Sequence, residues 1–134
     1  MKINIFSTGK TKETWLQEAL LEYEARLKGR VQLEWKIFKD DAALEKALTG
    51  ISFMALDEAG SLLSSHEFSA LLFREPRLNF LIGGPAGLTP LMRQTAKATI
   101  SLSRLTFTHQ IVRLILIEQI YRGLEIERGS PYQK

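Results

Sequence analysis

Residues 78–90 constrain the fold more than any other part of the sequence. The first five are mostly apolar and have the length of a buried strand, which ends at Gly83 and Gly84. Thr89 and Pro90 then supply a typical N-cap and first residue of a helix. Glycines at this place let the backbone approach a ligand closely, although a simple tight turn also explains them. A strand, a glycine loop and a helix in this order indicate an α/β sheet, in which ligands bind at the carboxyl ends of strands.

The rest of the chain alternates between strand and helix patterns. The expected strands are 2–7, 31–37, 51–56, 78–82 and 99–103, and the expected helices are 11–28, 41–48, 64–73, 90–97 and 109–124. Residues 57–60, Asp-Glu-Ala-Gly, are typical of a turn. The order predicts a parallel sheet with helices on both faces, in a single α/β domain over residues 1–134.

The last expected helix is apolar around almost its whole circumference. Its apolar residues are Ile111, Val112, Leu114, Ile115, Leu116, Ile117, Ile120, Tyr121 and Leu124. Such a helix must be buried on more than one side. One side can cover the sheet while another meets a second subunit, so we expect a homodimer through this helix. A core helix of a monomer is the alternative.

Composition excludes several classes of site. The chain has no cysteine, which excludes disulfides, zinc–thiolate sites and cysteine nucleophiles. Its two histidines, His66 and His109, are too few for a histidine-rich metal site, so we expect no metal. No signal-peptide pattern and no apolar run long enough for a bilayer occur, so we expect a cytoplasmic protein without a membrane partner.

Charge is distributed unevenly along the chain. Residues 1–89 carry 11 basic and 12 acidic side chains, a net charge of −1, whereas residues 90–134 carry 7 basic and 3 acidic, a net charge of +4. The basic excess therefore follows the glycine loop. A phosphate-facing surface and an ordinary solvated face both fit this excess.

The candidate binding and catalytic residues lie on three loops and at the start of one helix. The loops 56–58, 83–87 and 103–107 are expected at one edge of the sheet, where they could hold a small organic cofactor. His109 and Arg113 share a helix face, and the helix dipole favours a neutral imidazole that can accept a proton. Arg113 could hold a phosphate. In the structural alternative, His109 helps Thr108 to cap the helix and Arg113 pairs with Glu118 or with a neighbouring chain.

Motifs along the chain then match a known family. They are Phe-Leu-Ile-Gly-Gly-Pro-Ala-Gly-Leu at 80–88, Ser-Leu-Ser-Arg-Leu-Thr-Phe-Thr-His-Gln at 101–110, Val-Arg-Leu at 112–114, Glu-Gln-Ile-Tyr-Arg at 118–122 and Gly-Ser-Pro-Tyr at 129–132. In this order they resemble the ribosomal RNA large subunit methyltransferase H family, which are small SPOUT-type methyltransferases with a trefoil knot. The resemblance implies a homodimer that binds S-adenosylmethionine and methylates N3 of a pseudouridine in 23S rRNA of the assembled ribosome.

The resemblance also implies site residues. Cofactor contacts are expected at Leu56, Gly83, Gly84, Gly87, Leu102, Ser103, Arg104, Leu105, Thr106 and Phe107. His109, Arg113 and Tyr132 are expected to position the base or to remove its proton. Gln133 stands where the family usually has a histidine, so a catalytic role of the tail would depend on Tyr132, Gln133 and Lys134.

Two other functions fit the same fold. One is a SPOUT methyltransferase that acts on another rRNA or tRNA atom, such as a ribose 2′-hydroxyl. The other is a ribosome-binding factor without catalytic activity, which would lack affinity for S-adenosylmethionine.

Overall fold

A five-stranded sheet with the order β2-β1-β4-β3-β5 forms the centre of the fold, and every strand pair in it is parallel. The structure, a computed structural model, describes residues 1–133, with the backbone alone for Gln133. The Gln133 side chain and Lys134, both part of the expected tail, lie outside the described residues. The strands are β1 Lys2–Thr8, β2 Gln32–Phe38, β3 Met54–Leu62, β4 Arg77–Ile82 and β5 Ala98–Ser101. The helices are α1 Thr14–Leu27, α2 Asp41–Leu48, α3 Ser65–Leu72, α4 Pro90–Thr95, α5 His109–Glu127 and the 3₁₀ turn η1 Pro131–Gln133.

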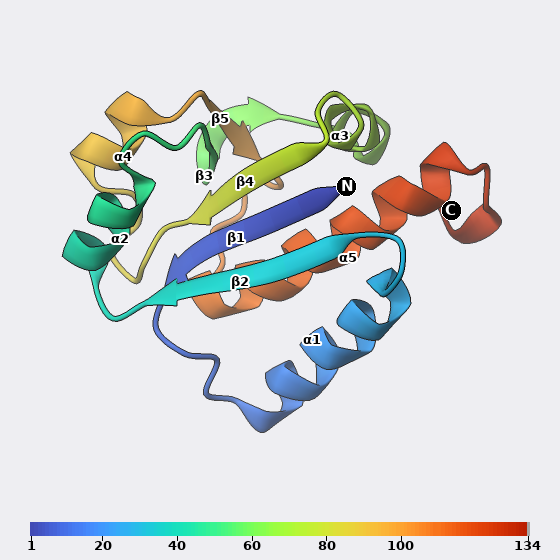
Figure 1. Ribbon diagram of the computed structural model, residues 1–134, viewed down its shortest axis with the longest axis horizontal. Helices are drawn as coiled ribbons and strands as arrows, with labels where there is room; N and C mark the ends of the chain where they lie inside the picture. The colour runs from blue at the N-terminus through green and yellow to red at the C-terminus, as the bar shows by residue number, and fades with distance from the viewer. Residues whose placement is uncertain (134) are drawn as a thin grey trace.

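Helices cover both faces of this sheet, as the sequence predicts. Ile3 and Ile5 pack into one apolar core with α1, α3 and α5, because alternate residues of a strand point to the same face. Phe6 and Leu81 point to the other face and pack with α2 and α4. Figure 1 shows α2 and α4 on the opposite side of the strands from α1 and α5. Burial on both faces explains why β4 is apolar except for Arg77 and Asn79.

The expected turn at residues 57–60 is wrong, because these residues lie within β3. Strand β3 pairs with β5 on both sides of the segment, and the register shifts between Leu56 and Ser61. Gly60 lies so close to β5 that an added Cβ would be 2.8 Å from backbone atoms of Thr99 and Ile100. The polar, glycine-containing segment is therefore a bulge, which has the same local sequence signature as a turn.

Helix α5 starts at the carboxyl edge of the sheet and runs back toward the amino end of β1 (Figure 1). Leu116, Ile117 and Ile120 are completely buried against the sheet. Gly123 lets the helix approach α3 closely, since an added Cβ would lie 2.6 Å from Leu72 Cδ1. The Ser69 hydroxyl of α3 donates a 2.6 Å hydrogen bond to the Gly123 carbonyl. This packing fixes the direction of α5 and places His109 at the carboxyl edge.

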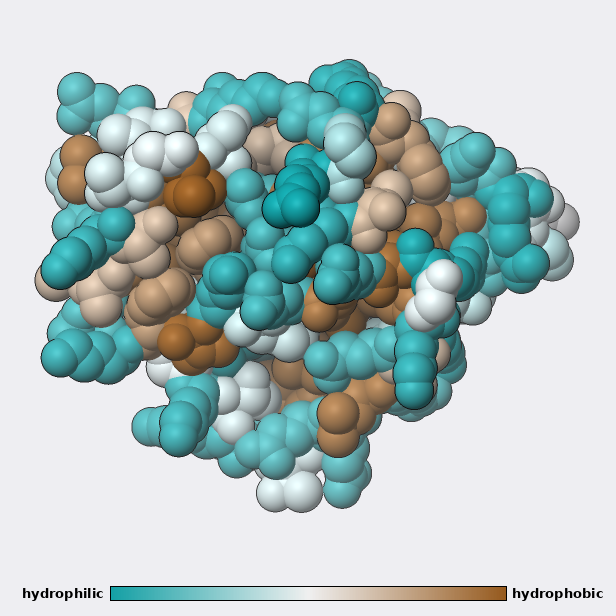
Figure 2. All heavy atoms as spheres, in the orientation of Figure 1, coloured by the Kyte–Doolittle hydropathy of each residue, from teal (hydrophilic) through white to brown (hydrophobic). Residues whose placement is uncertain are grey.

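The surface in the view of Figure 2 is mostly hydrophilic, and apolar side chains gather on it near α2, α4 and the carboxyl ends of the strands. Among the helices that the structure describes, none combines the length and apolar character that crossing a membrane requires.

Candidate functional site

A cavity of about 780 Å³ opens at the carboxyl edge of the sheet. The three loops expected there, 56–58, 83–87 and 103–107, all contribute to its wall. The start of α5 and the start of α1 complete the lining. In Figure 1 the arrowheads of β1, β2 and β4 point to this edge. The volume is within the range of cavities that hold ligands of cofactor size.

Nearly all the expected cofactor residues line this cavity. Leu56, Gly83, Gly84, Gly87, Leu102, Ser103, Leu105, Thr106 and Phe107 contribute to the wall, whereas Arg104 does not. The Arg104 side chain is exposed, so its neighbours supply the cavity surface on this loop. The sequence motifs therefore mark positions that the fold brings together from three separate strand ends.

The glycine loop has a geometry that other residues would disturb. The Gly87 amide donates to the Gly84 carbonyl at 2.9 Å, which closes a tight turn, and Gly87 has a φ of 83°. An added Cβ at Gly83 would lie 2.7 Å from the Gly87 carbonyl carbon, and one at Gly84 would lie 2.9 Å from Thr8 Oγ1. The loop thus folds against itself and against the end of β1. Thr89 then caps α4 by accepting the Met92 amide, as the sequence predicts.

The loop after β5 presents apolar side chains at the cavity. Ser103 holds the loop, because its hydroxyl accepts the Leu105 amide at 3.0 Å and its carbonyl accepts the Ser101 hydroxyl at 2.8 Å. Leu105 is 70% exposed, and Phe107 is also exposed. Exposed apolar groups around a cavity are typical of surfaces that a ligand or a second chain covers.

His109 lies in the cavity wall at the first residue of α5, which Thr108 caps by accepting the Ile111 amide. Burial, together with the positive charge of Arg113, lowers the pKa of His109 below its ordinary 6.5. The imidazole is therefore neutral at physiological pH, so one ring nitrogen can accept a proton or a hydrogen bond. Thr108 supplies the cap, and the described hydrogen bond of the His109 ring is with the Gln110 side chain.

Arg113 is buried inside the fold and is not part of the cavity wall. Its side chain is 1% exposed, and its guanidinium donates to Ser7 Oγ, Thr8 O, Gly9 O and Thr11 Oγ1 at 2.6–3.1 Å. All these acceptors lie at the end of β1 or just after it. The arrangement does not support the expected phosphate contact, because the guanidinium is buried and both of its terminal nitrogens already bind the protein, while Nε is buried without a described partner. Pairing with Glu118 is also absent among the described contacts of Arg113.

Tyr132 lies at the other end of α5 from His109. Its hydroxyl donates to Glu118 Oε2 at 2.9 Å, and its ring packs edge-on against Tyr121 at 4.9 Å. Burial, followed by hydrogen bonds with Tyr23 and Glu118, raises its pKa. The turn that carries Tyr132 folds back along α5, so its hydroxyl lies beside Glu118, about 14 Å along the helix from His109, and Tyr132 is not part of the cavity lining.

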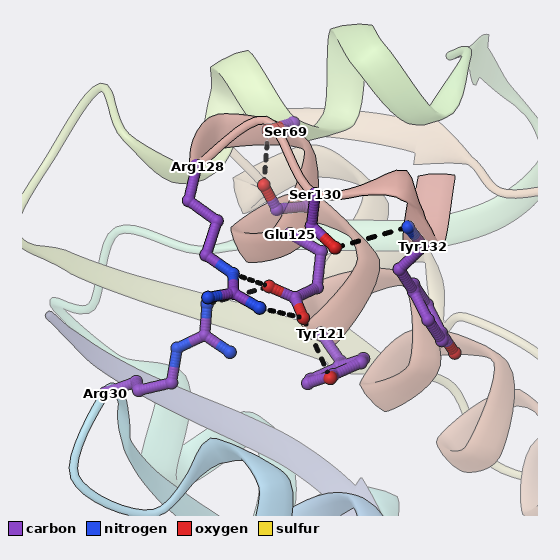
Figure 3. Close-up of polar contacts among 8 residues, drawn as sticks. Arg30, Ser69, Tyr121, Glu125, Arg128, Ser130 and Tyr132 are labelled. Carbon is purple, nitrogen blue, oxygen red and sulfur yellow. Dashed lines mark hydrogen bonds and ion pairs between the residues drawn. The ribbon is translucent and has the colours of Figure 1, made fainter. Parts of the chain in front are cut away.

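A buried carboxylate fixes the same end of α5 (Figure 3). Glu125 is 3% exposed and accepts hydrogen bonds from Arg30, Arg128 and the Tyr121 hydroxyl. Figure 3 shows these groups converging on one carboxylate, with Ser130 and Tyr132 beside it. The Tyr132 amide donates to Ser130 Oγ at 3.2 Å, so the turn that carries Tyr132 is tied to this helix end.

Several residues of the cavity wall carry no signal in the sequence that points to a binding site. Trp15 has the spacing of the apolar residues of α1, which predicts a core position, yet it is 54% exposed and lines the cavity. Arg93 also lines the cavity and forms a 3.0 Å ion pair with Asp57, which belongs to the expected loop 56–58. No local sequence signal marks this pair, because 36 residues separate the partners. Within the described residues, no group of three or more acidic or histidine side chains suits a metal ion.

Comparison with known proteins gives the class and then the family. The model of a family described as predicted SPOUT methyltransferase matches residues 1–133, so the chain is a SPOUT-type methyltransferase by family. The SpoU methyltransferase AviRb of Streptomyces viridochromogenes, solved in complex with AdoMet, has a similar fold. Its TM-score is 0.54 at 12% identity, and the match covers 95% of this chain and 58% of that one.

Proteins of similar sequence identify the family within the SPOUT methyltransferases. Ribosomal RNA large subunit methyltransferase H of Protochlamydia amoebophila is 46% identical over 100% of this chain and 99% of its own length. The protein of the same name from Prochlorococcus marinus strain MIT 9515 is 36% identical over 99% of this chain and 96% of its own. The chain therefore belongs to the ribosomal RNA large subunit methyltransferase H family.

Proposed function

We propose that this protein transfers the methyl group of S-adenosylmethionine to N3 of a pseudouridine in 23S rRNA of the assembled ribosome. The observation that carries the proposal is the cavity at the carboxyl edge, which joins the glycine loop, the loop after β5 and His109. The relatives are named as rRNA methyltransferases, and a protein of similar fold was solved with AdoMet. A ribosomal substrate places the reaction in the cytoplasm.

The residues of the cavity fit such a methyl donor. Gly83 and Gly84 expose backbone without side chains, which allows close contact with an adenosine and its thioether chain. Leu105 and Phe107 supply exposed apolar surface for an adenine ring. Both glycines and both apolar residues line the same cavity, so one bound molecule can contact all four.

His109 is our candidate for the group that receives the proton of the target base. S-adenosylmethionine supplies an electrophilic methyl group on a sulfonium, and N3 of the base attacks it once its proton has left. A neutral imidazole at the cavity wall can accept that proton, and the lowered pKa of His109 keeps it neutral. The fold contributes the rest of the catalysis by holding the two reactants in line.

A homodimer through α5 is part of the proposal. Apolar side chains that remain partly exposed on α5 and around the cavity are Ile111, Leu114, Ile115, Trp15, Leu105 and Phe107. A two-fold axis across α5 would pack two copies of the helix antiparallel. Such packing would bring the Tyr132 end of one chain toward the His109 end of the other, where Tyr132 could assist the base. Sedimentation as a monomer at micromolar concentration would refute this part.

Two measurements test the function. Calorimetry should detect binding of S-adenosylmethionine to the isolated protein, and the lack of any affinity would point to a ribosome-binding factor without activity. Mass spectrometry of 23S rRNA from a deletion strain should show one pseudouridine that has lost its N3 methyl group. Loss of a ribose methyl group instead would identify a different SPOUT reaction. The trefoil knot implied by the family stays a prediction.

A further inference from the structure

The β1–α1 loop, residues 9–12, is held by buried groups although it lies at the surface. Arg113 donates to the carbonyls of Thr8 and Gly9 at 2.8 and 2.6 Å, and to Thr11 Oγ1 at 2.8 Å. Gly9 has a φ of 76°, which turns the chain out of β1. A loop that is fixed in this way loses little conformational freedom when it binds a partner.

This loop borders the cavity beside His109. Gln110 Nε2 donates to the Lys10 carbonyl at 3.3 Å and lies 3.3 Å from His109 Nε2. Gln110 and His109 both line the cavity. The backbone of the loop therefore lies next to His109 and Gln110 of the cavity wall, and Glu13, the residue that follows the loop, lines the cavity itself.

The charges of this region are positive. Lys10 and Lys12 are exposed, and neither forms an ion pair with another described residue, unlike Lys36 and Lys97. Arg113 lies beneath them, 1% exposed, and forms no ion pair among the described residues either. The oxygens that bind Arg113 are neutral hydroxyl and carbonyl groups. No negative charge therefore cancels the electric field of this buried cation. Glu13 is the nearby counter-charge in sequence, and it is exposed to screening solvent.

We propose that Lys10 and Lys12 form a phosphate-binding site for the rRNA backbone at the mouth of the methyl-transfer cavity. This inference rests on the proposed function. Exposed lysines supply the sequence-independent attraction to nucleic acid, and a fixed loop gives that attraction a defined place. Arg113 acts as the positioning residue, since it holds the backbone that carries both lysines.

The test replaces both lysines by glutamine and measures methyl transfer to ribosomes from a strain that lacks this enzyme. Each lost phosphate contact weakens binding about five-fold at ~0.15 M salt, so KM for ribosomes should rise about 20-fold. The plot of log(kcat/KM) against log salt should become shallower by about 2. The rate at saturating ribosomes and the affinity for S-adenosylmethionine should stay unchanged.

A matched control removes the same charge from the opposite edge of the sheet. Lys28 and Arg74 are exposed there, and the double change Lys28→Gln and Arg74→Gln should leave KM and the salt slope as in the parent protein. Equal effects of the two double variants would overturn the inference, as would an unchanged KM for the Lys10 and Lys12 variant. A loss of affinity for S-adenosylmethionine would overturn it too, because the lysines would then bind the cofactor carboxylate. A parent protein that methylates no ribosome would instead refute the proposed function.

Discussion

Glu125 gives the most direct test of how α5 is fixed at its carboxyl end. The carboxylate is 3% exposed and lies 3.3 Å from Arg30 Nη2, 3.1 Å from Arg128 Nη2 and 2.9 Å from the Tyr121 hydroxyl. The hydrogen bonds of Arg128, partly offset by burial, lower the pKa of Glu125 from 4.5 to about 2, and Tyr121 and Arg30 add to this effect. The change Glu125→Gln keeps the shape and removes the charge.

The pKa gives the size of the expected effect. A shift from 4.5 to about 2 corresponds to about 3 kcal/mol of preference for the ionised form in the folded protein. Solvent screens part of this, since the Arg128 side chain is 65% exposed and that of Arg30 is 33% exposed. We therefore expect Glu125→Gln to lower the free energy of unfolding by about 2 kcal/mol at pH 7.

The lowered pKa of Glu125 also predicts how its contribution to stability changes with pH. The pKa of Glu125 is lowered on folding, so its contribution is fully present above the unfolded pKa of about 4.5 and is lost as the pH falls toward about 2. The difference between parent and variant should therefore be constant above pH 6 and shrink progressively below pH 4.5. Urea unfolding followed by circular dichroism, at one fixed protein concentration, measures both quantities.

Glu22→Gln is the matched control. Glu22 forms a 2.6 Å pair with Arg26 on the surface of α1, and its side chain is 62% exposed. An exposed pair of this kind contributes at most about 0.5 kcal/mol, so the control should unfold almost as the parent does. If Glu125→Gln costs no more than the control, or if its cost does not fall at low pH, the carboxylate does not stabilise the helix end as argued.

Three further predictions concern the cavity and its supports. Gly83→Ala should weaken binding of S-adenosylmethionine at least about ten-fold in calorimetry, because its Cβ would lie 2.7 Å from the Gly87 backbone; unchanged affinity would show that the loop does not contact the cofactor. The His109 pKa, measured by NMR, should lie below 6.5, so that the contribution of this group to stability falls as the pH drops through 6.5; a value above 6.5 would remove the argument for a neutral base. Arg113→Lys should lower the free energy of unfolding by about 2–4 kcal/mol in urea, because an ammonium cannot replace the planar guanidinium on four acceptors; a loss below about 0.5 kcal/mol would contradict its role as an anchor.

Local patterns in the sequence already determine much of this protein. The apolar run before Gly83 predicts β4, and Thr89 with Pro90 marks the start of α4, because strand burial and helix capping depend on near neighbours in the chain. The alternation of strands and helices predicts a parallel sheet with helices on both faces, which the structure confirms. That topology alone places the three candidate loops at one edge, since parallel strands share their carboxyl ends.

Tertiary structure alone decided which side chains face the cavity. Arg113 and His109 share a helix face, yet His109 reaches the cavity and Arg113 turns inward to bind the end of β1, 104 residues away at Gly9. Trp15 has the spacing of the apolar core residues of its helix, but its side chain lies in the cavity wall and not in the core. The Asp57–Glu58 segment has the composition of a turn, while pairing with β5 makes it a bulge. In each case the local sequence allows two environments, and contacts with distant residues determine which one the side chain occupies. The reason is that burial and hydrogen bonding depend on the packed neighbours and not on spacing along the chain.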